Sequence, residues 1–433
     1  MTGSPVSRRP LFLVVAAALL GTAACSEDLA TTENCPALCP EQSLDVEQVE
    51  LQPVTEDTTI AGFPLRGTEN RLLAARAGDS LDARVVYRFD SLPRFYRNAA
   101  LDSLPITQAL EPVVEVLILR RTESLVPAGT TIEAYDVDVA GEDTSTALLA
   151  AAFTPARLLG TVAVPERPAS DTTTVDTLRI PLPPATLVRK INTDSVLRVG
   201  LRVAAPSEAR VRFSPTSARV AFRAVADTAV ARLTATPLSK TPASNAQLRI
   251  DLSSFMILPR GTPAPVGPVL VVGGLPARRS LLRFAVPPAI TDSSVILRAT
   301  LVLTQRPVRG YLASDTLRLE PLAVVTSDVV RDVTRRMLFA TNTTSPFTGS
   351  PVLPLNPLAV VPSDSGEFEV PMATLVGTWR ASNAIGYLPE LVLATSFEGA
   401  SPLQAHFFSA EAPLALRPKL RISFIRRINF SIP

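Results

Sequence analysis

The sequence predicts an all-β protein, and three observations lead to that prediction. Short runs rich in β-branched residues recur along the chain, and turn clusters such as GEDTS and SDSG separate them. No stretch of a dozen residues combines a 3.6-residue apolar period with helix caps. Many of the 40 prolines stand at the ends of the apolar runs, where a proline does not remove a ladder hydrogen bond. Many short strands with regular turns favour antiparallel β-sandwiches, here of a jelly-roll-like kind.

Individual runs give the same reading. In ARVVYRFD, Val85, Tyr87 and Phe89 alternate with two arginines, which places them on opposite faces of a sheet. The runs PVVEVLILRR from Pro112 and VILRATLVLTQRP from Val295 are longer and more apolar, as expected of central strands. The best helix candidate is SDVVRDVTRRMLFA, at 327–340.

The chain repeats itself. DARVVYRFDSLP and ARRSLLRFAVPP match in register at a separation of 195 residues. Two further pairs of similar segments follow in the same order. LRIPLPPATLVRK is similar to FEVPMATLVGTWR, and RFSPTSARVAFRAV is similar to FFSAEAPLALRPKLRISFI. Three pairs of similar segments in one order indicate an internal duplication. We therefore predict two tandem β-sandwich modules, at 61–226 and 227–433.

The N-terminus resembles a bacterial lipoprotein signal. Arg8 and Arg9 precede the apolar run LFLVVAAALL, and small residues then end at Cys25. This ending resembles the lipobox, although Thr22 stands where leucine is usual. The resemblance implies a signal peptide at 1–24, a lipid on Cys25 and a flexible leader at 25–60. Since no aspartate follows Cys25, it also implies an outer-membrane location, on the periplasmic or the surface face. SRRPLF also resembles a twin-arginine signal, so the export route stays open.

The two other cysteines, Cys35 and Cys39, lie in the Pro-rich stretch ENCPALCP. Outside the cytoplasm two nearby thiols oxidise, so we predict a local disulfide. Zinc would need further Cys or His ligands, and the chain has one histidine. A redox motif would normally be CxxC, and this spacing is CxxxC.

Composition argues against several functions. The net charge of +2 gives no field suited to nucleic acid. His406 is the one histidine, and we expect it to be structural, because in the repeat it stands opposite Val211 on a strand. No G-x-S-x-G, P-loop or H-E-x-x-H motif is present. We therefore expect no enzyme and no cofactor. The alternative is a carboxylate-dependent enzyme acting on polysaccharide, which needs no histidine.

Two binding hypotheses rest on strand patterns. Asp136 and Asp138 share one strand face and form a weak Ca²⁺ candidate, although a solvated face is the simpler reading. Arginines at alternate strand positions can match a row of sugar carboxylates. The arginines concerned are Arg198, Arg202, Arg210 and Arg212. One Trp and five Tyr are a thin supply of rings for stacking on sugars.

The second module carries a set of strand motifs with a family likeness. They comprise Ser280, Leu281, Leu282, Arg283, Phe284, Ala299, Thr300, Leu301, Leu303, Phe408, Ser409, Glu411, Arg417, Pro418, Lys419 and Leu420. This set resembles the DNRLRE domain, which overlaps carbohydrate-binding module family 96. The match covers about 270–433, and residues 60–226 match weakly. It implies a jelly-roll-like sandwich in exported proteins, some of which bind acidic polysaccharide.

Together these observations predict a non-enzymatic cell-envelope lipoprotein with a structural, adhesive or polysaccharide-binding role. Its expected partners are the membrane, through the N-terminal lipid, and acidic polysaccharide. The alternatives are the carboxylate-dependent enzyme and an assembly subunit of an outer-membrane complex that uses exposed edge strands.

Overall fold

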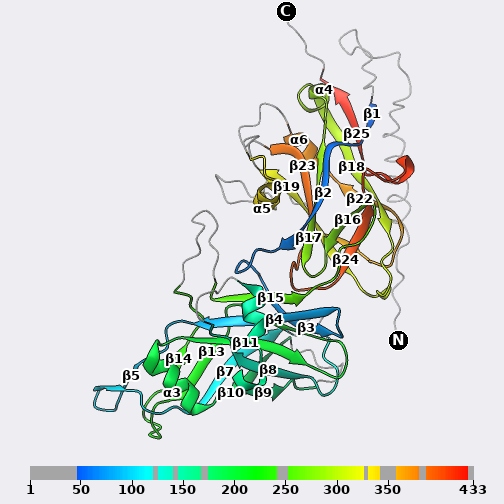
Figure 1. Ribbon diagram of the computed structural model, residues 1–433. Coiled ribbons are helices and arrows are strands. Elements are labelled where there is room, and N and C mark those ends of the chain that lie inside the picture. The colour runs from blue at the N-terminus through cyan, green and yellow to red at the C-terminus, as the bar shows by residue number, and fades with distance from the viewer. Residues whose placement is uncertain are drawn as a thin grey trace, which may run out of the picture. The chain divides into compact units, whose positions relative to one another are not determined.

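The computed structural model describes residues 46–119, 125–139, 145–166, 174–240, 252–325, 330–341, 357–379 and 387–427 (Figure 1). By its internal contacts the chain divides into two units, Met1–Val46 and Glu47–Pro433. Every element given below belongs to the second unit. The predicted signal peptide, Cys25, Cys35 and Cys39 lie outside the described residues. In the described ranges, no helix combines the length and the apolar character needed to cross a membrane.

The prediction of an all-β protein is confirmed: nearly all regular structure is antiparallel sheet. One sheet, called sheet B here, runs in the order β14-β13-β7-β12-β3-β4-β11-β8-β9, with β10 added beside β7 and β15 beside β4. Its strands are β3 (Leu72–Ala77), β4 (Leu81–Phe89), β7 (Leu110–Leu119), β8 (Thr131–Asp136), β9 (Leu158–Ala163), β10 (Val175–Pro181), β11 (Leu197–Ala204), β12 (Ala209–Phe213), β13 (Arg219–Arg223), β14 (Leu233–Ala235) and β15 (Ser254–Arg260). The same part of the chain holds α2 (Thr146–Ala151), α3 (Pro184–Thr193) and a separate hairpin of β5 (Phe95–Arg97) and β6 (Ser103–Pro105).

The second sheet, sheet A, runs in the order β1-β25-β18-β24-β16-β17-β23-β19-β20, with β2 beside β17, β21 beside β19 and β22 beside β18. Its strands are β1 (Glu47–Leu51), β2 (Pro53–Phe63), β16 (Val269–Gly273), β17 (Ala277–Phe284), β18 (Ser294–Arg306), β19 (Leu317–Val325), β20 (Ala340–Thr341), β21 (Leu358–Val360), β22 (Gly366–Pro371), β23 (Tyr387–Thr395), β24 (Gln404–Phe408) and β25 (Lys419–Arg426). The helices here are α4 (Pro288–Thr291), α5 (Val333–Phe339) and α6 (Ala373–Thr378).

Each sheet folds over one apolar core. The core of sheet B takes side chains from both ends of the strand order, including Val116 of β7 and Val199 of β11. Val85, Tyr87 and Phe89 point into this core, as their alternation in the sequence predicted. The core of sheet A is built in the same way, with Leu301 of β18 and Leu391 of β23 among its members. Each sheet therefore forms a β-sandwich, and we call them sandwich B and sandwich A.

The two sandwiches share one topology. The strand orders of the two sheets correspond from β14 and β1 at one end to β8 and β19 near the other. The registers correspond as well: Val114 of β7 pairs with β10 on one side and β13 on the other, and Leu301 of β18 pairs with β22 and β25. This agreement is what a duplicated module requires.

The edge strands, however, are exchanged between the sandwiches. β2 directly precedes β3 of sandwich B, yet it pairs with β17 of sandwich A. β15 directly precedes β16 of sandwich A, yet it pairs with β4 of sandwich B. The strands that precede β2 and β15 follow the same rule. β1 pairs with β25 of sandwich A, and β14 pairs with β13 of sandwich B. The strands β4 and β17 that receive the exchanged strands carry the phrase that the sequence repeats.

This exchange corrects two predicted boundaries. The range 25–60, assigned to a flexible leader, contains β1 and most of β2, which form antiparallel ladders with sandwich A. The boundary at 226/227 separates β14 and β15 from the sandwich to which they belong. In each case the neighbouring sequence suggested the wrong sandwich for the strand.

Polar contacts hold the exchanged strands at equivalent points. Thr59 of β2 accepts a hydrogen bond from the backbone nitrogen of Val271, at 3.1 Å. Met256 of β15 accepts one from the backbone nitrogen of Leu73, with its sulfur at 3.0 Å. Each contact joins an exchanged strand to the first strand of the hairpin that it enters.

A buried ion-pair cluster also holds β2. Arg336 of α5 contacts both Glu56 of β2 and Glu390 of β23. Glu390 is fully buried, and burial raises the pKa of its carboxyl, although Arg336 opposes that rise. Removing one member of such a cluster would leave an unpaired buried charge, so the cluster fixes β2 against sandwich A.

Candidate functional site

The four arginines predicted to form a binding row do not form one. Arg198 and Arg202 lie on β11, whereas Arg210 and Arg212 lie on β12. β3 and β4 stand between these strands in the sheet. Arg212 is fully buried, so it is not available to a ligand on the surface.

Each of the four has an internal partner. Arg202 contacts the Glu133 carboxylate at 2.6 Å, and Arg210 contacts Glu208 at 2.7 Å. Arg212 donates its Nε hydrogen to the backbone oxygen of Ala400, at 3.1 Å. Arg198 lies 3.6 Å from Asp90 and 3.7 Å from Asp138. Arg198, Arg202 and Arg210 therefore pair with carboxylates and Arg212 with a backbone oxygen, and the four do not form a row on one face.

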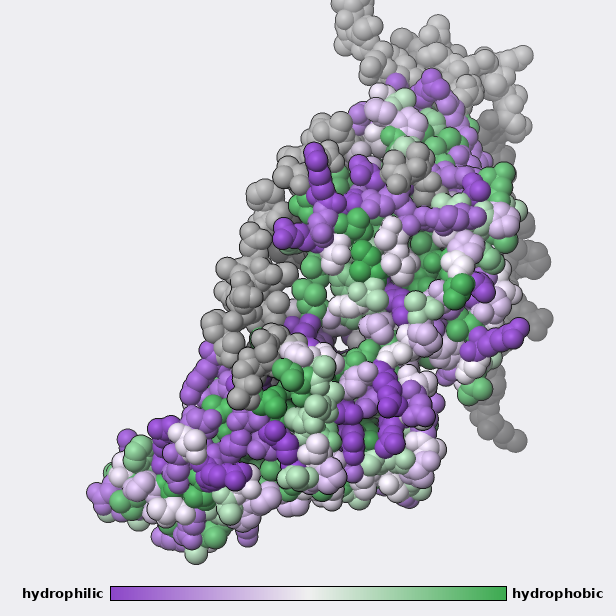
Figure 2. Space-filling model, in the orientation of Figure 1, coloured by the Kyte–Doolittle hydropathy of each residue, from purple (hydrophilic) through white to green (hydrophobic). Residues whose placement is uncertain are grey.

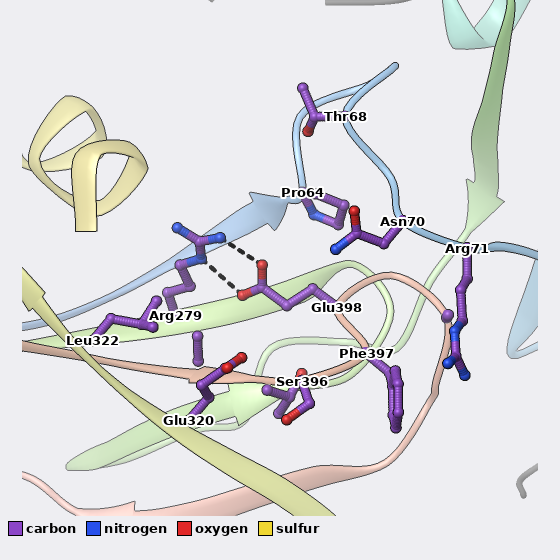
Figure 3. A pocket seen from close by; sticks show the side chains of 13 residues that line it. Pro64, Thr68, Asn70, Arg71, Arg279, Glu320, Leu322, Ser396, Phe397 and Glu398 are labelled. Atoms are coloured by element: carbon purple, nitrogen blue, oxygen red, sulfur yellow. Dashed lines mark hydrogen bonds and ion pairs between the residues drawn. The ribbon is translucent and has the colours of Figure 1, made fainter. Parts of the chain in front are cut away.

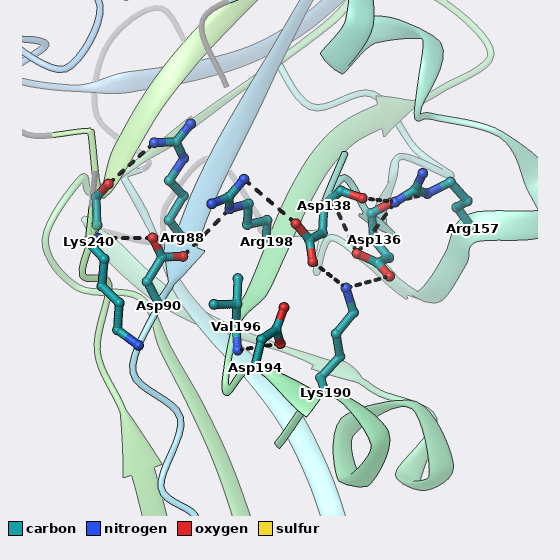
Figure 4. Close-up of polar contacts among 11 residues, drawn as sticks. Arg88, Asp90, Asp136, Asp138, Arg157, Lys190, Asp194, Val196, Arg198 and Lys240 are labelled. Carbon is teal, nitrogen blue, oxygen red and sulfur yellow. Dashed lines mark hydrogen bonds and ion pairs between the residues drawn. The ribbon is translucent and has the colours of Figure 1, made fainter. Parts of the chain in front are cut away.

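A cationic side chain stands at the weak Ca²⁺ candidate. Asp136 and Asp138 do lie together, but Lys190 of α3 stands between them (Figure 4), with its Nζ 3.2 Å from one carboxylate and 2.7 Å from the other. Arg157 adds a contact to Asp136 at 3.8 Å. The ammonium group already supplies the positive charge that a cation would bring. Across the described ranges, no group of three or more His, Cys, Asp or Glu residues is placed to hold a metal ion.

His406 lies on β24, buried between Val271 on one neighbouring strand and Arg306 on the other. Burial, together with the charges of Arg306 and Arg278, lowers the pKa of the imidazole to about 4. The ring is therefore neutral at pH 7. Its Nε2 has no hydrogen-bond partner among the described residues.

A polar pocket of about 210 Å³ remains as the candidate site (Figure 3). Residues from the connection between β2 and β3 form one wall, and the turn that follows β23 forms another. Between them Arg279 and Glu398 form a bidentate ion pair, with N–O distances of 2.7 and 2.6 Å. The Arg279 guanidinium also lies 4.5 Å from the centre of the Phe63 ring. We call this site the connection pocket.

At one end of the connection pocket, two guanidinium groups lie over the ring of Phe397. The Arg71 guanidinium lies 4.2 Å from the centre of its ring, and Arg212 lies 5.7 Å from it. Beside it, the hydroxyl of Ser396 is buried and makes no hydrogen bond within the described part of the chain. A stacked guanidinium next to a hydroxyl that lacks a partner suits binding of a small polar or anionic group. The carboxylate of Glu398 is held by Arg279 in the bidentate pair.

Glu69, in the same connection, is the titratable group most relevant near neutral pH. It accepts hydrogen bonds from the backbone nitrogens of Gly67, at 2.5 Å, and of Met256 in the exchanged strand β15, at 3.1 Å. Burial raises the pKa of the Glu69 carboxyl to about 7, and these hydrogen bonds and Arg66 only partly oppose the shift. The connection thus ties the two exchanged strands together through one carboxyl.

The repeated arginine of the two phrases has one role in both sandwiches. Arg84 pairs with Asp82 at 2.6 Å and stacks 4.5 Å from the centre of the Phe153 ring. Its counterpart Arg279 pairs with Glu398 and stacks on Phe63. The repetition singled out these arginines, but their partners are not repeated. Asp82 stands two residues before Arg84 in β4, whereas Glu398 lies in the turn after β23, and Phe63 ends β2. The connection pocket could not be read from the sequence for that reason.

Comparison with known proteins identifies no relative. No family model matches the chain, and no curated protein matches it. Alignments to solved structures include the VP2 subviral particle of infectious bursal disease virus, at 10% identity over 84% of this chain and 77% of that chain, with a TM-score of 0.10. Another is the Gt strain of the same virus, at 11% identity over 87% of this chain and 80% of that chain, also with a TM-score of 0.10. At such TM-scores the likeness carries no argument about fold or function.

Proposed function

We propose that this protein is a non-enzymatic lipoprotein of the bacterial outer membrane with a structural role in the cell envelope. The observation that carries the proposal is the reciprocal exchange of β2 and β15. The strands that follow the predicted lipid on Cys25 are built into sandwich A, the sandwich farthest along the chain. A pull on the anchor therefore acts on paired strands of sandwich A first, and the exchange transmits it to sandwich B.

Polysaccharide binding is the more specific version of this role. The resemblance of residues 270–433 to DNRLRE modules supports it, and so does the connection pocket, with Arg71 stacked on Phe397 beside the Ser396 hydroxyl, which has no hydrogen-bond partner among the described residues. The four arginines named from the sequence give it no support, because they are paired inside the protein. The contact residues for an acidic sugar would instead centre on Arg71.

Lipidation is tested by metabolic labelling with a palmitate analogue, followed by separation of inner and outer membranes. The full chain should take up label and fractionate with the outer membrane. A Cys25→Ala variant should lose both properties, whereas Cys35→Ala should keep them. Equal labelling of the Cys25→Ala variant would reject the anchor and with it the proposed location.

Polysaccharide binding is tested with the soluble chain from Glu27 onward on an array of acidic and neutral polysaccharides, with assays for released reducing ends and unsaturated products. Retention on acidic glycans that weakens with salt, and that Arg71→Gln abolishes, supports the specific version. Retention of no glycan leaves the structural role alone. Release of product would favour the carboxylate-dependent enzyme, and a discrete membrane partner would favour the assembly subunit.

A further inference from the structure

The hairpin of β5 and β6 has no counterpart in sandwich A. It lies in the connection between β4 and β7, at 90–109, whereas the corresponding connection between β17 and β18, at 285–293, holds only the short helix α4. Figure 1 shows the hairpin extending from the end of sandwich B, and Figure 2 shows hydrophobic and hydrophilic surface side by side at that end. The projecting element therefore belongs to sandwich B alone among the described residues.

The hairpin exposes large apolar side chains in its turn and along both of its strands. The exposed fractions are 72% for Leu101, 58% for Phe95 and 37% for Leu104. In the register of the hairpin, Phe95 pairs with Pro105 and Leu104 pairs with Tyr96, so Phe95 and Leu104 lie on opposite faces of the ribbon. The apolar surface thus surrounds the hairpin and is not confined to one side.

The turn holds Leu101 in a conformation that is costly for leucine. Its φ is +68°, in the left-handed region that glycine and asparagine prefer. The side chain of Asn98 fixes the turn, since its Oδ1 accepts a hydrogen bond from Asp102 N at 2.8 Å and its Nδ2 donates one to the Asp102 carboxylate at 3.1 Å. A strained backbone that exposes a leucine is a cost to folding, and such strain gathers at functional positions.

The base of the hairpin is braced on sandwich B. Ile106 is buried in the core, and its backbone nitrogen bonds to the Arg94 carbonyl at 3.0 Å. Arg94 donates to the Ser195 hydroxyl, and Tyr96 packs against the core. The tip is therefore presented on a fixed support.

We propose that the β5–β6 tip inserts into the surface of an anionic lipid bilayer. A protein groove would bury one face of a hairpin, but the apolar side chains here occupy both faces and the tip, which a bilayer covers on all sides. Exposed arginines flank these apolar side chains, Arg94 at the base of the hairpin and Arg97 between Phe95 and the turn, where they can contact lipid phosphates, while the carboxylate of Asp102 is bonded back to Asn98. The proposal does not depend on the lipid at Cys25.

The test uses the soluble chain from Glu27 onward and vesicles of phosphatidylethanolamine with or without phosphatidylglycerol. In flotation assays the chain should float with the phosphatidylglycerol vesicles. Leu101→Gly should lower the partition coefficient at least tenfold, and Phe95→Ser should act in the same direction. Since glycine relieves the strain at φ +68°, Leu101→Gly should unfold at a temperature no lower than the parent, which separates loss of binding from loss of fold. Leu312→Ser is the control, because Leu312 is 68% exposed in a loop of sandwich A, and its partition should not change.

A second readout is fluorescence. The native Trp379 is buried in the core of sandwich A, so a Phe95→Trp variant should add a signal that shifts to the blue with phosphatidylglycerol vesicles. Failure of the parent chain to float would overturn the proposal. So would binding that Leu101→Gly leaves intact, since that would be adhesion through charge alone. Photo-crosslinking from position 101 to one discrete envelope protein, without flotation, would assign the tip to a protein partner and also reject the bilayer.

Discussion

The hydroxyl oxygens of Thr59 and Ser280 lie 2.8 Å apart, although 221 residues separate them in the chain. Thr59 belongs to β2 and Ser280 to β17, so this contact lies in the ladder that joins an exchanged strand to sandwich A. Ser280 in turn donates to the backbone oxygen of Val271, at 2.9 Å. Thr59 accepts from the nitrogen of the same residue. One pair of hydroxyls thus satisfies the backbone of β16 at the point where β16 and β17 separate.

Thr59→Val should therefore destabilise the fold. The change removes the acceptor for Val271 N, and a buried group left unsatisfied costs about 1–3 kcal/mol, whereas the Ser280 hydroxyl keeps its bond to Val271 O. Urea unfolding measures the free energy. Thr58→Val, at the neighbouring position in the same strand, should change it by less than about 0.5 kcal/mol. Equal effects of the two variants would mean that the hydroxyl contact contributes nothing specific.

Glu69 should make stability depend on pH. Its pKa is raised to about 7 in the folded protein, so the folded state favours the protonated carboxyl. The resulting stabilisation is complete below the unfolded pKa of about 4.5 and is lost as the pH rises towards 7, by up to about 3 kcal/mol.

A Glu69→Gln variant does not titrate, although its single amide oxygen can accept only one of the two hydrogen bonds that Gly67 N and Met256 N donate to the two carboxylate oxygens. Unfolding measured from pH 5 to pH 8 should lose more stability in the parent chain than in this variant. Asp79→Asn, at a fully exposed side chain, serves as the control. Parallel curves of stability against pH for the parent and Glu69→Gln would contradict the raised pKa of the Glu69 carboxyl.

Gly200 should not tolerate a side chain. A Cβ built there lies 2.4 Å from Cζ of Phe153 and 2.5 Å from Cγ1 of Val137, so Gly200→Ala should overpack the face of β11 at a cost of about 1–3 kcal/mol. Gly377, in α6, has no atom within 4 Å of its Cβ position. Gly377→Ala should instead stabilise the protein by up to about 1 kcal/mol, through helix propensity. Thermal unfolding of the two variants should therefore shift in opposite directions, and a shift of both in the same direction would contradict this packing.

The sequence predicted the features that depend on local pattern. Period two placed Val85, Tyr87 and Phe89 in a core, and that is where they lie. The helix candidate at 327–340 contains α5, which begins after Asp332 because the Asp332 carboxylate accepts a hydrogen bond from the backbone nitrogen of Arg335, at 2.8 Å. In both cases neighbouring residues decide the outcome.

The features that depend on pairing between distant segments were missed. PVTEDTTIAGF is polar enough to suggest a leader, and nothing within it shows that β17 is its partner. The arginines of β11 and β12 were visible, but Glu133 becomes the partner of Arg202 only once the β8–β11 register is known. The connection pocket depends on both kinds of information, and so it could be found only in the structure.

The exchange of β2 is tested most directly by disulfide trapping in a chain that begins at Glu41 and so lacks the three native cysteines. β2 places Thr59 opposite Ser280, whereas a strand paired with β4, as β15 is, would place the same position opposite Val85. We predict that Thr59→Cys with Ser280→Cys closes an intramolecular disulfide, seen as a compact monomer on a non-reducing gel and as a linked peptide by mass spectrometry. Thr59→Cys with Val85→Cys should stay reduced. Closure of the second pair and not the first would show that β2 pairs within its own module, and it would contradict the exchange.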